Sequence, residues 1–160
     1  MKKVLFFLTT ASLLLLMIGH VSAQVVLPEV TITSARNIPQ RVDEAFKTTF
    51  ESAEDPVWYQ ANKNYLVKFL DNDMKNNALF RKNGQLIYNI SYGFEKDIPE
   101  EVFNLVSNRY KEYDVVVAFN VKQDERNIWI VNLEDEKTMV TARVEDGVLD
   151  EARRIKKSNK

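Results

Sequence analysis

The sequence predicts an α+β domain built as a tandem repeat, in which one helix and four antiparallel strands occur twice. Three observations predict this fold. Ile38-Pro39 returns sixty residues later as Ile98-Pro99, an amphipathic helical pattern follows each copy, and four extended runs follow each helix. We expect one curved antiparallel sheet with both helices on one face, with repeat 1 over 38–92 and repeat 2 over 98–156.

Each copy begins with an amphipathic helix, expected over 39–52 and 99–111. Apolar residues recur at i, i+3, i+4 and i+8 in both, which is the spacing of a helix that packs on one face. The matching residues are Val42, Ala45, Phe46 and Phe50 in the first copy, and Val102, Leu105, Val106 and Tyr110 in the second. Proline suits the first helical turn, because the N–H that it lacks would have no partner there.

Eight extended runs, separated by turn residues, make up the rest of both copies. Asn83-Gly84 and Asp146-Gly147 are the strongest turn signals, because these dipeptides between extended runs favour tight hairpins. The expected strands are Val57–Gln60, Tyr65–Leu70, Asn77–Lys82 and Gln85–Tyr92 in the first copy, and Val115–Lys122, Ile128–Leu133, Met139–Glu145 and Val148–Ile155 in the second.

The N-terminus has the pattern of a secretory signal peptide over residues 1–23. Lys2 and Lys3 precede an apolar stretch that is short for crossing a bilayer, and the expected cleavage site lies between Ala23 and Gln24. We therefore expect a periplasmic or secreted protein without stable insertion in the membrane. Residues 24–37 precede the domain of residues 38–160, and are interpreted as a leader, with an extra edge strand as the alternative.

Composition excludes several classes of function. The chain has no cysteine, and its single histidine, His20, lies in the signal peptide. This excludes Ser-His-Asp and Cys-His catalysis and the usual zinc, copper and haem ligand sets, so we expect no catalytic residue, metal or cofactor. The net charge of −1 becomes about −3 when Lys2 and Lys3 are removed, which makes nucleic acid an unexpected partner.

Two acidic stretches have the residue types of a cation or carboxylate site. Asp71-Asn72-Asp73 opens like a calcium loop, but Asn76 and Lys82 stand where that loop needs glycine and glutamate, so a hairpin turn is favoured. Glu134-Asp135-Glu136 is expected to point into water at a turn, and not to flank a substrate. The basic C-terminus is interpreted as an edge strand and tail, with attraction to anionic lipid as the alternative.

Aromatic side chains are the candidates for partner binding. Along Gln85–Tyr92, alternate positions share one face, and they are Leu86, Tyr88, Ile90 and Tyr92. Two helices cannot cover both faces of eight strands, and an uncovered face with tyrosine is typical of a protein-binding surface. The candidate residues are Tyr59, Tyr65, Tyr88 and Tyr92.

Several short motifs carry a resemblance to a known family. They are the helix after Ile38-Pro39, Ala53-Glu54-Asp55-Pro56-Val57-Trp58, Tyr65-Leu66-Val67-Lys68-Phe69, and Phe80-Arg81-Lys82-Asn83-Gly84. Over residues 38–156 the chain resembles the PepSY-like, beta-lactamase-inhibitor-like periplasmic domains of the Bacteroidetes. The resemblance implies a tandem fold with one open sheet face and a non-catalytic binding or inhibitory role. It assigns a functional role to no individual residue of this chain.

The expected function is therefore the binding of an envelope protein or peptide without catalysis. The alternatives are a hydrolase of the envelope that uses carboxylates, and a structural or lipid-handling protein of the envelope. The hydrolase would show turnover of sugars or peptides, and the lipid-handling protein would need a closed apolar cavity between helices and sheet.

Overall fold

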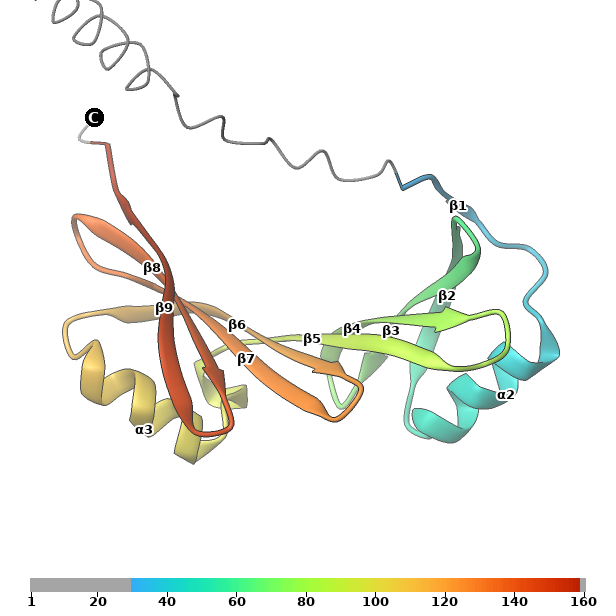
Figure 1. Cartoon of the computed structure of the whole chain (residues 1–160), viewed down its shortest axis with the longest axis horizontal. Coiled ribbons are helices and arrows are strands. Elements are labelled where there is room, and N and C mark those ends of the chain that lie inside the picture. Colours follow the sequence, from blue (N-terminus) through green and yellow to red (C-terminus); the bar gives the residue numbers. More distant parts are fainter. Residues whose placement is uncertain (1–29, 159–160) are drawn as a thin grey trace, which may run out of the picture.

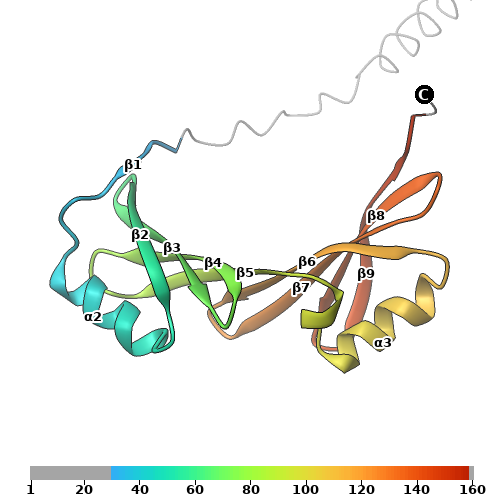
Figure 2. The same ribbon diagram turned by 180° about the vertical axis from the view of Figure 1, so that it is seen from behind.

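The structure is a computed structural model that describes residues 30–158 of the chain (Figures 1 and 2). One antiparallel sheet of nine strands forms its centre, and each strand pairs with the next along the chain. The helices α2 (Gln40–Thr49) and α3 (Glu100–Arg109) lie at opposite ends of this open sheet. The α+β class and the antiparallel sheet are confirmed, while the signal peptide of residues 1–23 lies outside the described residues.

All eight predicted strands are present, most of them slightly longer than expected. The strands are β1 (Ile32–Ser34), β2 (Glu54–Ala61), β3 (Asn64–Asp71), β4 (Met74–Arg81), β5 (Leu86–Gly93), β6 (Asp114–Gln123), β7 (Arg126–Glu134), β8 (Thr138–Glu145) and β9 (Val148–Lys156). Both helices are shorter than predicted, because each ends before an aromatic cap residue, Phe50 or Tyr110. A short 3-10 helix, η2 (Glu95–Asp97), was not predicted.

The strand β1 is the ninth strand, and it lies in the segment interpreted as a leader. Ile32 pairs with Ala61 and Ser34 pairs with Tyr59, so that β1 covers the edge of β2. The preferred interpretation is wrong over Ile32–Ser34, and the alternative of an edge strand is correct there. The physical reason is that β-branched residues suit an extended chain, and the open edge of β2 offers unpaired backbone groups.

The turn Asn72-Asp73 joins β3 to β4 and bears out the hairpin interpretation of this acidic stretch. Its φ angles are 49° and 63°, so both central residues have the left-handed conformation of a type I′ turn. Asn and Asp tolerate this conformation better than most residues do. The two acidic side chains therefore belong to a tight connection between paired strands, not to a calcium loop.

A hydrophobic core lies between α2 and the first half of the sheet. Val42 and Phe46 of the helix pack against Val67, Phe69, Ala78 and Phe80 of β3 and β4. The Phe46 ring has its centroid 5.1 Å from that of Phe69 and 5.3 Å from that of Trp58, both in edge-to-face geometry. Such aromatic contacts stabilise the core beyond the burial of apolar area alone.

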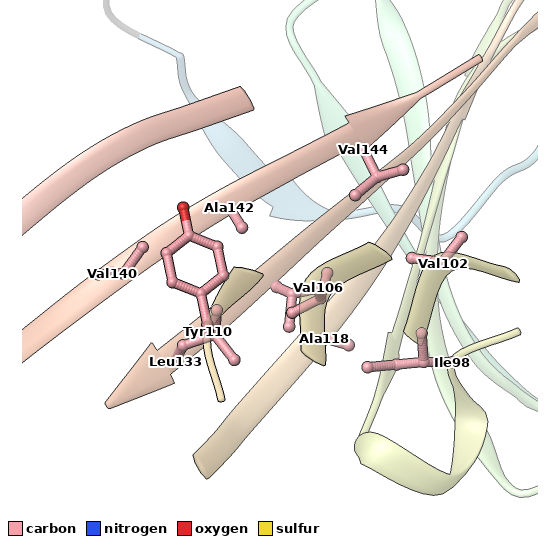
Figure 3. Close-up of a cluster of buried hydrophobic side chains, with 10 residues drawn as sticks. Ile98, Val102, Val106, Tyr110, Ala118, Leu133, Val140, Ala142 and Val144 are labelled. Atoms are coloured by element: carbon pink, nitrogen blue, oxygen red, sulfur yellow. The ribbon is translucent and has the colours of Figure 1, made fainter. Parts of the chain in front are cut away.

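A second core lies between α3 and the other half of the sheet (Figure 3). Val102, Val106 and Tyr110 come from the helix and its cap. They pack against a set of small and branched side chains from β6, β7 and β8, which are Ala118, Val131, Leu133, Val140, Ala142 and Val144. This core is mostly aliphatic, whereas the core under α2 is mostly aromatic.

Candidate partner-binding face

A row of large apolar side chains crosses the sheet from β2 to β7. Residues that are paired in neighbouring antiparallel strands point to the same face. Tyr59 pairs with Leu66, Leu66 with Leu79, and Leu79 with Tyr88, and the row continues in the same way through β6 and β7. We call this surface the outer face; its apolar residues are Tyr59, Leu66, Leu79, Tyr88, Ile90, Tyr92, Phe119, Val121, Ile128 and Ile130.

The apolar row of the outer face is separate from both hydrophobic cores. Leu66 and Ile128 are only 9% and 8% exposed, although neither belongs to the core under α2 or under α3. Their neighbours on the same face shield them, and the rest of the row is half-buried. Within residues 30–158, neither helix packs on this row. The outer face therefore carries a continuous apolar surface that only its own side chains shield.

Three of the four predicted tyrosines lie on the outer face. The Tyr59 ring has Lys68 Nζ at 5.3 Å from its centroid. The Tyr92 hydroxyl accepts a hydrogen bond of 2.9 Å from Asn77 Nδ2, and its ring packs edge-to-face on Phe119 at 5.3 Å. Burial raises the pKa of the Tyr88 hydroxyl, and the nearby Tyr92 raises it further. These hydroxyls can donate hydrogen bonds at the edge of an apolar surface, which suits aromatic anchors.

Tyr65 does not lie with the other three tyrosines. It pairs with Phe80 and packs against the core under α2. Leu86 was predicted to share a face with Tyr88, and this prediction is wrong. A β-bulge pairs Leu79 with Tyr88 but Phe80 with Leu86, so Leu86 turns toward the core.

Sequence reasoning missed six residues of the row because it considered the alternation of one strand only. These residues are Leu66, Leu79, Phe119, Val121, Ile128 and Ile130. The signal is present in β3, where Leu66 and Val67 are neighbours and both are apolar. A strand with apolar residues on both faces is expected to be covered twice, so such strands predict a second buried or binding surface.

The charged rim of the outer face differs between its two ends. At the β3–β4 end, Lys68, Lys75 and Arg81 are exposed, and they form no ion pair among residues 30–158. At the β8–β9 end, Arg143 forms ion pairs with Glu145 and Asp150. The first end therefore offers free positive charge beside the apolar row, whereas charge at the second end is largely paired.

The acidic run at the β7–β8 turn serves the turn itself. Asp135 Oδ1 accepts hydrogen bonds from the backbone N of Lys137 at 2.7 Å and from Thr138 N at 2.5 Å and Oγ1 at 2.8 Å. Glu134 forms an ion pair with Lys157 at 2.9 Å. Desolvation alone would raise the pKa of the Asp135 carboxyl, but these hydrogen bonds outweigh it and hold the pKa at about 2.

Acid unfolding tests the role of Asp135. Its folded pKa lies below the ordinary value of 3.8, so its ionised form contributes stability above pH 4 that is lost as the pH falls toward 2. Asp135→Asn keeps an acceptor oxygen and removes the ionisation. We expect the loss of stability between pH 4 and 2 to be shallower in this variant, measured by urea unfolding at each pH. Glu136→Gln is the matched control in the same turn, and an equal effect in both variants would contradict this assignment.

Comparisons with known proteins identify the fold. No family model matches the chain, and neither does any curated protein sequence. A BLIP-like protein from Bacteroides fragilis superposes with a TM-score of 0.62 at 15% identity, over 79% of this chain and 91% of that chain. A DUF2874 family protein from Bacteroides uniformis gives 0.58 at 18% identity, over 74% and 88%. The fold is similar to that of BLIP-like proteins.

A third solved structure also has a similar fold. It is a protein from Bacteroides eggerthii, provisionally described as periplasmic, with a TM-score of 0.58 at 17% identity over 75% of this chain and 89% of that chain. Neither helix among the described residues is long and apolar enough to cross a membrane. At these identities the likeness establishes the fold, and the assignment of function has to come from the site.

Proposed function

We propose that this protein is a non-enzymatic binding module of the cell envelope, which holds a protein or peptide against its outer face. The observation that carries the proposal is the continuous apolar row from Tyr59 to Ile130, which includes three tyrosines and which neither helix of the described chain covers. Apolar surfaces of this kind with a charged rim are typical of protein interfaces, and aromatic side chains at their centre contribute most of the binding energy.

The proposal includes a tandem arrangement of two like units. Several features support it. Each helix has ten residues and follows a proline cap, Pro39 or Pro99, whose φ and ψ angles are −57° and 136° in the first case and −56° and 143° in the second. Each helix also ends at an aromatic cap residue whose N–H bonds back to the fourth residue before it. Two units of this kind, joined edge to edge, would make one long sheet.

The proposal also places both helices on one face of that sheet, which leaves the outer face free. Strand β5 supports this placement. Asn89 pairs with Ala78 of the α2 core, and Gly93 pairs with Ala118 of the α3 core. Asn89 and Gly93 are four positions apart, so they share a face. In Figures 1 and 2 both helices lie along the same side of the ribbon.

An envelope location and a binding role fit together. The signal-peptide pattern and the provisionally periplasmic neighbour support export, and the fold shared with one BLIP-like protein supports a binding role. A lipid-handling role would need an apolar cavity between helix and sheet. Aromatic rings around Phe46 pack in that space in one unit, and Val106 and its neighbours pack there in the other. The two pockets beside α3, of about 250 and 240 Å³, are lined by charged residues such as Glu101, Glu145 and Lys111 as well as by apolar ones.

Alanine substitution on the outer face tests the proposal. Tyr88→Ala and Tyr92→Ala are each expected to weaken capture of a partner from an envelope extract by roughly 10-fold or more, because aromatic anchors are the costliest interface residues to truncate. The measurement is quantitative pull-down with mass spectrometry, with thermal unfolding as a check of the fold. Leu105→Ala removes an exposed apolar side chain of α3 and is the matched control. Equal capture of the partner by the wild type and by the three variants would contradict the proposal.

A further inference from the structure

A polar cleft of about 460 Å³ lies on the side of the sheet opposite the outer face. Its floor consists of Asn76 of β4, Asn89 and Ser91 of β5, and Asn120 of β6. The C-terminal end of α2, with Phe50, forms one wall, and Trp129 of β7 forms part of another. The cleft thus occupies the stretch of sheet between the two hydrophobic cores.

The floor of this cleft concentrates the buried polar groups of the molecule. Asn76, Asn89 and Asn120 are 3%, 6% and 7% exposed, and they are the buried polar side chains found in residues 30–158. On the same face, the positions that lie under the helices carry apolar residues such as Ala78 and Ala118. Burial of a carboxamide lowers the stability of the fold unless the group is hydrogen-bonded. Three buried carboxamides in one cleft therefore indicate a structural or binding role for these groups.

Hydrogen bonds within the floor satisfy most of these groups but leave one acceptor over. Asn89 Nδ2 donates to Asn76 Oδ1 at 3.1 Å and to Ser91 Oγ at 3.2 Å, and Ser91 Oγ donates to Asn76 Oδ1 at 2.6 Å. Asn89 Oδ1 is buried and has no hydrogen-bond partner in the described part of the chain. A buried acceptor without a partner costs stability, and Asn89 lines the cleft, so a ligand donor that reaches this oxygen would gain a hydrogen bond that the protein alone does not make.

We propose that this cleft binds a neutral saccharide, with Asn89 Oδ1 accepting a hydrogen bond from a sugar hydroxyl. The floor offers amide and hydroxyl groups, which both donate and accept, as the hydroxyls of a sugar do. Asp71, Asp97 and Lys122 also line the cleft, and charges of both signs do not select an ionic ligand of one sign, whereas sugar hydroxyls can donate to the carboxylates and accept from the ammonium group. Trp129 and Phe50 provide ring surfaces for the apolar face of a sugar, and the volume lies in the range of ligand sites.

Saccharide titration tests the site directly. The purified full chain is titrated with cellobiose, maltose and N,N′-diacetylchitobiose, and binding is followed by tryptophan fluorescence, to which Trp129 contributes from within the cleft. We expect at least one of these sugars to bind with a dissociation constant of about 1 mM or lower. Failure of all three, or binding of tri-alanine in their place, would overturn the proposal.

Two variants assign the binding to the cleft floor. Asn89→Leu removes the acceptor that has no partner. Asn120→Ala removes a second amide of the cleft floor and replaces the first variant in the test if Asn89→Leu does not fold. Each is expected to weaken the best sugar by roughly 10-fold or more, since loss of a buried hydrogen-bonding group is costly for a polar ligand. Asn77→Ala, an amide on the outer face, is the matched control and should bind sugar like the wild type. Equal sugar affinity in a folded cleft variant and the wild type would contradict the assignment, whatever the outcome at the outer face.

Discussion

Phe46→Ala is expected to lower the free energy of unfolding by about 3–5 kcal/mol, because truncation of a buried phenylalanine leaves a cavity that the surroundings only partly fill. Phe46 is 4% exposed, and its ring lies within 5.7 Å, centroid to centroid, of the rings of Phe50, Trp58 and Phe69. These partners come from the cap of α2 and from β2 and β3, so the substitution loosens the helix and both strands together.

Denaturant unfolding followed by fluorescence measures this effect, since Trp58 lies in the same core. Phe94→Ala is the matched control, because Phe94 has the same side chain but is 64% exposed. A change within about 0.5 kcal/mol is expected for this surface position. Similar losses of stability for Phe46→Ala and Phe94→Ala would mean that α2 does not pack on the sheet as described.

Gly84→Ala is expected to cost about 2–5 kcal/mol of stability, as the sum of two contributions. Gly84 has a φ of +90°, which alone costs an L-residue roughly 1–2 kcal/mol. An added Cβ would also lie 2.6 Å from the carbonyl oxygen of Arg41 and 3.3 Å from Ala45 Cβ. Both neighbours belong to α2, so the helix would have to move, and overpacking of this kind costs about 1–3 kcal/mol.

Gly147→Ala provides the matched comparison in the second unit. Gly147 has a φ of +74°, but an added Cβ would meet no atom within 4 Å in the described structure. We therefore expect only the conformational part of the cost, about 1–2 kcal/mol. Urea unfolding of both variants separates the two contributions. A Gly147→Ala loss equal to or larger than the Gly84→Ala loss would contradict the close contact between the β4–β5 turn and α2.

Local patterns in the sequence were sufficient to predict most of the helices and strands. The stripe from Val42 to Phe50 predicts a helix because the spacing of its apolar residues follows the helical period, and both turn glycines mark hairpins through their dihedral freedom. These features depend on residues close together in the chain. For that reason the eight strands and two helices were found, with differences at their ends.

The features that were not predicted depend on pairing between strands that are distant in the sequence. Strand β1 forms because β2 offers an open edge, and the bulge in β5 separates Leu86 from Tyr88 by a shift in pairing that alternation cannot show. Tyr65 and Tyr59 look alike in sequence, yet register places only Tyr59 with Leu66 on the outer face. The amide floor of the cleft likewise comes from three strands, and its asparagines have no common motif in the sequence.

Site-directed photo-cross-linking in the intact envelope is the most direct test of the outer face as the site of binding. A photoreactive phenylalanine analogue replaces Tyr88 in one version of the protein and Thr48, exposed on α2, in another. We predict a specific cross-linked partner from position 88 that is absent from position 48, since the partner lies over the apolar row. No adduct at position 88, or the same adducts at both positions, would contradict the account.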